Sequence, residues 1–161
     1  MKSKSIGTLA MCAALAMVLS YLDGLIPSPG VPGVKLGLAN LVVVFALYRL
    51  GWREAAGISL LRVFLTALLF GHAASLLYSA SGALLSFAGM AVLKKTDKFS
   101  VAAVSVSGGV LHNVGQILMA CALMGRNVAY YLPVLILSGV GAGIAIGVLA
   151  AILVRRIRLI R

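Results

Sequence analysis

Long apolar runs alternate with short polar or glycine-rich breaks along this chain. The breaks fall at 27–33, 51–53, 71–72, 94–98 and 125–127. Between them lie six apolar segments, most of them near the length of about 20 residues that a membrane-spanning helix needs. These segments cover residues 5–26, 34–51, 54–71, 73–93, 99–124 and 128–154. The pattern predicts an all-α bundle of six transmembrane helices that forms one integral membrane domain, residues 1–161.

Composition supports this class of protein. Of the 161 residues, 62% are hydrophobic and 11% are charged, whereas soluble domains are roughly 25% charged. A transmembrane β-barrel would need alternating segments of about 10 residues. The apolar runs here are instead continuous and rich in Ala, Leu and Gly, which favours helices.

Basic residues gather on one side of the predicted bundle. With the N-terminus inside, 11 of the 14 basic residues fall inside: Lys2, Lys4, Arg49, Arg53, Lys94, Lys95, Lys98, Arg155, Arg156, Arg158 and Arg161. Because positive charge marks the cytoplasmic side, both termini are predicted to be cytoplasmic. The net charge of +11 is then explained by topology and by anionic lipid at the basic C-terminal tail, with no nucleic-acid partner.

Two stripes of small residues stand out. Gly139, Gly143 and Gly147 form a row with a spacing of four on the last predicted span. Small residues at this spacing let helix backbones approach closely in lipid, so this row predicts internal packing. Ala10 and Ala14 form a similar patch on the first span, which could pack internally or face another protein.

Motifs of the common enzyme classes are missing. The chain has no GxxxxGK[ST] phosphate loop, so ATP hydrolysis by that route is excluded. Its three acidic residues, Asp23, Glu54 and Asp97, lie on different segments, and they offer no cluster that would hold a Mg²⁺-diphosphate. We therefore predict a protein that is not an enzyme and has no catalytic residue, metal site or cofactor of its own.

Arg62 lies in the middle of the third predicted span. An Arg at the bilayer centre costs about 2.5–3.5 kcal/mol on translocon-based scales, so it needs a partner or a watery cavity. Three interpretations are open. Arg62 could pair with Asp23 or with backbone carbonyls, could bind an anionic ligand, or could extend to the membrane surface.

A polar cluster interrupts the fifth span in the stretch GGVLHNVGQ, residues 108–116. His112 and Gln116 share one helix face, and so do Asn113 and Gln116. Polar side chains at membrane depth need internal partners. A cluster flanked by glycines favours the wall of a binding cavity over a single contact between helices.

The stretch between the first two spans is rich in proline and glycine, which predicts a shaped loop. Lys35 follows this loop on the predicted outer side, against the charge bias, and Asn40 lies five residues further on. The segment could be a plain turn whose lysine reaches lipid headgroups. Alternatively, it could be a lid over an outward-opening cavity, with Lys35 as an anion anchor.

Four stretches resemble a bacterial family of membrane proteins, the Gx transporter family, which is also labelled heptaprenyl diphosphate synthase component I. They are PGVPGVKLGLANLVVVFALYRLG (29–51), LLRVFLTALLFG (60–71), SASGALLSFAGM (79–90) and HNVGQ (112–116). The patterns PGxKLGLAN and HNxxQ are the most specific parts. The family in turn is similar to the six-helix S components of energy-coupling factor (ECF) transporters.

This resemblance implies a subunit in the bacterial cytoplasmic membrane that captures a small, anionic micronutrient. Its partners would be a coupling subunit, docked at Ala10 and Ala14, and two cytoplasmic ATPases. The expected substrate-binding residues are Lys35, Asn40, Arg62, His112, Asn113 and Gln116. The alternative is a non-catalytic accessory subunit in polyprenyl diphosphate or quinone metabolism, or in flavin-linked extracellular electron transfer.

Overall fold

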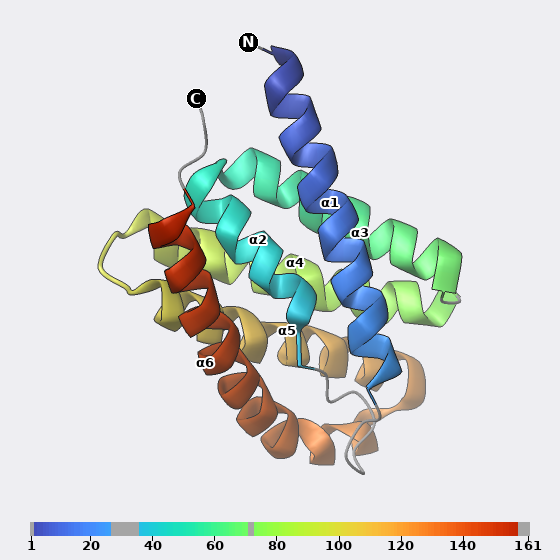
Figure 1. Cartoon of the computed structure of the whole chain (residues 1–161). Coiled ribbons are helices and arrows are strands. Elements are labelled where there is room, and N and C mark those ends of the chain that lie inside the picture. Colours follow the sequence, from blue (N-terminus) through green and yellow to red (C-terminus); the bar gives the residue numbers. More distant parts are fainter. Residues whose placement is uncertain (1, 27–35, 71–72, 158–161) are drawn as a thin grey trace.

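The computed structural model describes residues 2–26, 36–70 and 73–157, with side chains from residue 6 onward. Within these residues the chain is helical (Figure 1). The elements are α1 (Lys2–Leu25), α2 (Leu38–Arg49), α3 (Trp52–Phe70), α4 (Ala73–Lys95), α5 (Val101–Met124), the 3₁₀ helix η1 (Arg126–Tyr131) and α6 (Leu132–Arg156). The predicted all-α architecture is confirmed for the part of the chain that the structure describes.

Four helical segments have the length and apolarity of a membrane span: Ile6–Leu25, Ala73–Lys95, Val101–Met124 and Arg126–Arg156. The predicted second span, 34–51, contains a helix of only 12 residues. At 1.5 Å per residue this helix rises roughly 18 Å, less than the hydrocarbon core. The third, α3, is 19 residues long but carries Arg53, Glu54 and Arg62. The structure thus supports a multi-pass membrane protein, while the count of six spans stays a prediction.

The turn between α2 and α3 is tight because Gly51 ends α2. The backbone N–H groups of Leu50 and Gly51 both donate to the carbonyl of Ala46, at 2.8 and 3.0 Å, which closes the last turn of the helix. Gly51 has φ of +130°, a conformation that other residues rarely adopt. The break expected at 51–53 is therefore a two-residue connection, and α2 and α3 become antiparallel neighbours.

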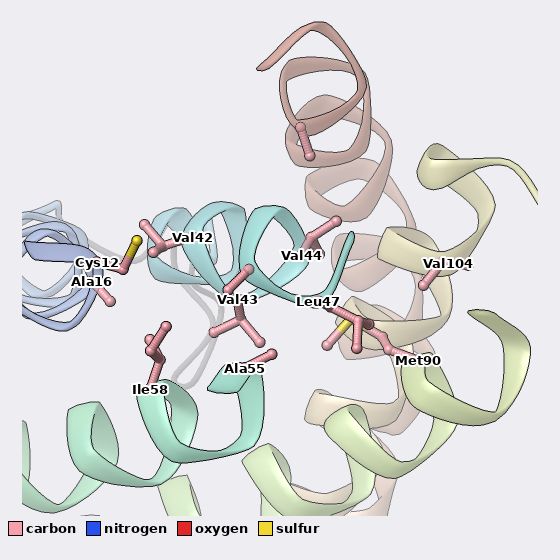
Figure 2. Close-up of a cluster of buried hydrophobic side chains, with 12 residues drawn as sticks. Cys12, Ala16, Val42, Val43, Val44, Leu47, Ala55, Ile58, Met90 and Val104 are labelled. Atoms are coloured by element: carbon pink, nitrogen blue, oxygen red, sulfur yellow. The ribbon is translucent and has the colours of Figure 1, made fainter. Parts of the chain in front are cut away.

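The hydrophobic core surrounds the short helix α2. Six consecutive α2 residues, from Val42 to Leu47, are buried, so this helix is enclosed on all sides. Figure 2 shows Cys12 and Ala16 of α1, Ile58 of α3 and Met90 of α4 around them. A fully enclosed helix has no lipid-facing side, which explains how a segment this short can be stable inside the bundle.

One end of the bundle gathers the basic ends of several helices. The Arg49 guanidinium donates through Nη2 to the carbonyl of Val154 in α6. The Lys94 ammonium donates to the carbonyl of Leu47 at 2.5 Å and lies 5.4 Å from the centre of the Tyr48 ring. Figure 1 shows the start of α1 and the ends of α2 and α6 on the same side. That this basic end faces the cytoplasm stays a prediction.

The predicted glycine row of α6 packs against α5, which confirms its structural role. A Cβ atom added at Gly143 would lie 2.6 Å from the Cα of Val106, and one at Gly147 would lie 2.7 Å from the Cα of Ala102. Gly109 and Gly139 face each other in the same way. Close backbone packing of this kind replaces the hydrophobic driving force that helices lack in lipid.

We expect Gly143→Ala to destabilise the protein, because its new methyl group would overlap the α5 backbone. Overpacking of this kind costs about 1–3 kcal/mol. The matched control is Gly141→Ala in the same helix, since nothing lies within 4 Å of a Cβ atom at Gly141. Thermal unfolding of the purified proteins in detergent should show a lower Tm for Gly143→Ala only. Equal Tm values for the two variants would contradict the packing.

Candidate functional site

A cavity of about 390 Å³ lies among the helices, and all six α-helices line it. Ligand pockets for small molecules commonly measure about 300–1,000 Å³. The lining includes five of the six residues that the sequence predicts for a binding site: Asn40, Arg62, His112, Asn113 and Gln116. The sixth, Lys35, lies outside the residues that the structure describes. Residues distant in sequence thus meet around one cavity.

The cavity lies toward the end of the bundle opposite the basic end. Its lining includes Leu25 at the end of α1, Leu36 just before α2, Phe70 at the end of α3 and Ser75 in the first turn of α4. Because successive helices run in opposite directions, these four positions share one end. The core around Val42 to Leu47 fills the other part of the bundle. The cavity therefore approaches the side that topology predicts to be external.

Helix α3 presents a polar face to the cavity. Ser59, Arg62 and Thr66 line it, and their spacing of three and four residues places them on one side of the helix. The Arg62 Nη1 donates to the Ser20 hydroxyl of α1 at 3.2 Å. The Arg62 Nε and the Thr66 Oγ1 are buried and have no hydrogen-bond partner among the described residues. Since buried polar atoms are normally paired, these two atoms mark a place where a partner is missing.

Asp23 holds the start of α2 against the end of α1. The side chain is buried, and its two carboxylate oxygens accept the backbone N–H groups of Leu36 and Gly37, each at 3.0 Å. These N–H groups lie at the positive end of the α2 dipole, which favours a negative partner. Asp23 therefore holds the end of α1 next to the start of α2, although Asp23 and Leu36 are 13 residues apart in sequence.

The sequence left open whether Arg62 and Asp23 form an ion pair. Among the described residues, these two side chains form no ion pair with an N···O distance of 4 Å or less. Both side chains nevertheless line the same cavity, and the carboxylate acts on the guanidinium electrostatically. The interpretation in which Arg62 extends to the membrane surface is wrong, because this side chain faces the cavity. Among the described lining residues, the formal charges are one positive, on Arg62, and one negative, on Asp23.

The α5 cluster is divided between packing and the cavity. Asn113 is buried and donates to the carbonyl of Leu135 at 2.5 Å and to the Ser138 hydroxyl at 3.4 Å. Its amide therefore ties α5 to α6 while lining the cavity. His112 and Gln116 lie against Gly82 of α4, where an added Cβ atom would approach both side chains within 3.0 Å. The sequence predicted a cavity wall here, and Asn113 also stabilises the helix pair that forms it.

Asn40 lines the cavity from the first turn of α2. Its Nδ2 lies 3.9 Å from the Met90 sulfur, a long contact with a weak acceptor. An added Cβ atom at Gly108 would lie 3.3 Å from the same Nδ2. Close packing therefore fixes the position of the Asn40 amide, which makes no strong hydrogen bond to the described residues.

Several hydroxyl groups in the lining were not predicted as part of a site. They are Ser20, Ser59, Thr66, Ser75, Ser79 and Ser86. The hydroxyls of α3 are seven residues apart, and those of α4 are four and seven residues apart, so a search for polar positions with helical periodicity would have found them. Singly, a hydroxyl in an apolar helix can satisfy itself by bonding its own backbone, as Ser81 does with the carbonyl of Tyr78 at 3.0 Å.

The predicted docking residues lie apart from the cavity. Ala10 and Ala14 are exposed on α1, whereas Ala13 and Ala16 of the same helix are buried. The alanine patch therefore does not pack internally, and it borders other exposed apolar residues such as Met11. Exposure of this surface leaves it available to lipid or to a protein partner.

Within the described residues, the fold is all-helical and holds a cavity with polar side chains in its lining. Its four long apolar helices support a multi-pass membrane protein. The family model described as heptaprenyl diphosphate synthase component I matches residues 12–153, and the chain belongs to this family. Comparison with curated proteins and with solved structures gave no match.

We expect Asp23→Ala to destabilise the protein, because two backbone N–H groups would lose their acceptor. Each buried donor left unsatisfied costs about 1–3 kcal/mol. Asp23→Asn keeps one acceptor oxygen, so its Tm in detergent should fall less. Asp97→Asn serves as the control, since Asp97 is exposed in the α4–α5 turn with φ of 52°, a conformation that Asn tolerates. Equal Tm values for Asp23→Ala and the control would contradict this role.

Proposed function

We propose that this protein is the substrate-binding membrane subunit of an ECF-type uptake transporter for a small, anionic molecule. The observation that carries the proposal is the cavity of about 390 Å³ lined by all six helices. A void of this size inside a close-packed bundle has to be occupied by ligand or water, because protein interiors leave few such spaces. A cavity to which all six helices contribute suits capture of a molecule more than passage along a channel.

The lining supports a polar ligand. Arg62 supplies a fixed positive charge, and Asn40, His112 and Gln116 supply groups that donate or accept hydrogen bonds. Such groups are costly at membrane depth and are typical of substrate pathways. Lys35, which the sequence predicts as an anion anchor, would meet an incoming anion on the external side before the anion reaches Arg62. Asn113 would hold the wall in place.

Energy for uptake would come from other chains. The sequence has no phosphate loop, so two cytoplasmic ATPases and a membrane coupling subunit would drive the cycle. The exposed alanines of α1, Ala10 and Ala14, offer a surface where a partner helix could approach closely. The proposed subunit lies in the bacterial cytoplasmic membrane with its basic end inside, as the charge bias predicts.

A second function is favoured by the family description. The words "component I" imply another component, and this protein would then be the non-catalytic membrane partner of a heptaprenyl diphosphate synthase. In that case the catalytic chain would supply the carboxylate clusters that this sequence lacks. Purification from the native membrane followed by mass spectrometry separates the two functions. A coupling subunit and ATPases indicate transport, whereas a soluble prenyltransferase indicates the second function.

We expect Ala142→Phe to remove the small molecule that purifies with the protein, because the new ring would fill the cavity. Ala145→Phe on the same helix is the matched control, since Ala142 lines the cavity and Ala145 is exposed. Mass spectrometry of the denatured proteins should show at least about tenfold less bound compound in Ala142→Phe, equivalent to about 1.4 kcal/mol of affinity. Equal amounts in both variants, or none in the wild type, would contradict capture.

We expect the double variant Ala10→Leu/Ala14→Leu to lose its membrane partner, because larger side chains would keep a partner helix at a distance. Ala88→Leu, on the exposed surface of α4, adds a similar side chain elsewhere and should keep the partner. Quantitative mass spectrometry of proteins that purify with each variant measures the effect. A coupling subunit retained by the double variant would place the docking surface elsewhere.

A further inference from the structure

We propose that Arg62 and Thr66 bind a carboxylate group of the ligand, and that this carboxylate is the ligand's only anionic group. The inference rests on the proposed function, in which the cavity captures a small molecule, and it adds the chemical class of that molecule. It is carried by two polar atoms, the Arg62 Nε and the Thr66 Oγ1. Both are buried and have no partner among the described residues.

The two atoms belong to one binding surface. Arg62 and Thr66 are four residues apart on α3, so their side chains are neighbours on the same helix face, and both line the cavity. A guanidinium N–H and a hydroxyl can each donate to one oxygen of a carboxylate. Pairing with an ionised acceptor gives the shorter and stronger kind of hydrogen bond. Ser20 holds the other side of the guanidinium through Nη1, which limits its rotation.

The charge balance of the cavity argues for a ligand with one negative charge. Asp23 lines the same cavity, and its two carboxylate oxygens accept the backbone N–H groups of Leu36 and Gly37. Arg62 therefore already has one negative neighbour. A phosphate ester or a diphosphate would bring two or more further charges, and the described lining has no second cation to balance them. Buried charge without a partner is strongly disfavoured.

Cavity size and the remaining lining restrict the rest of the ligand. The cavity volume of about 390 Å³ lies near the lower end of the range for small-molecule pockets, about 300–1,000 Å³. Hydroxyl groups of α4, such as Ser79 and Ser86, favour polar substituents, while Tyr21 and Phe70, with ring centres 4.8 Å apart, border one part. The site fits a compact, polar monocarboxylate.

Lactate, a small hydroxy-monocarboxylate, and inorganic pyrophosphate are suitable probes. Full-length protein in nanodiscs is heated with each probe at equal ionic strength. Lactate at about five times its Kd should raise the Tm by about 2–4 °C, and pyrophosphate should not. The increase should be absent in Arg62→Gln and reduced in Thr66→Val. Arg53→Gln, at an exposed arginine near the start of the same helix, should keep it.

Pyrophosphate that stabilises the wild type as much as lactate would overturn the proposal. So would a lactate effect that persists in Arg62→Gln and in Thr66→Val, or no lactate effect in the wild type. If Arg62→Gln fails to fold, Thr66→Val still decides between the outcomes. A compound that purifies with the wild type, is lost in Ala142→Phe and lacks a carboxylate would leave the proposed function intact and refute this inference alone.

Discussion

The carboxylate of Asp23 is the interaction on which the cavity end of the molecule depends. By accepting the N–H groups of Leu36 and Gly37, it fixes the start of α2 beside the end of α1. Helix α2 therefore begins beside the cavity, which Asn40 of its first turn lines, and continues into the core. A single buried acceptor thus connects the helix arrangement to the site.

The two halves of the bundle are held together by different means. Helices α4, α5 and α6 approach through glycines, with Gly115 lying against the backbone of α4 and Gly139 against that of α5. Around α2 the contacts come instead from branched and aliphatic side chains, such as Val43 and Leu47. Dispersion and interhelical hydrogen bonds drive the first kind of packing. The cavity lies where the two kinds of packing meet, and it takes its walls from both.

Much of the fold could be predicted from the sequence, because apolar runs and their breaks are local signals. The same is true of Arg62 and the α5 cluster, since polar groups in apolar helices stand out. The short α2 was not predicted, because its apolar run continues beyond the helix and its start is set by Asp23, a distant residue. Nor could the Asn113 bonds to α6 be predicted, since they depend on how two helices face each other. The hydroxyls of the lining show helical spacing only when they are taken together, and a single hydroxyl in an apolar helix gives no such signal.

The glycine contacts of α5 and α6 have a consequence for how this site can change over evolutionary time. Where a wall is built from backbone against backbone, any larger side chain at Gly109 or Gly139 would separate the helices. The opposite side of the cavity carries serines such as Ser59 and Ser79, which can be exchanged for other small or polar residues without moving a helix. Substitutions that change ligand preference within the family should therefore lie mainly on α3 and α4. The glycines between α5 and α6 should stay unchanged.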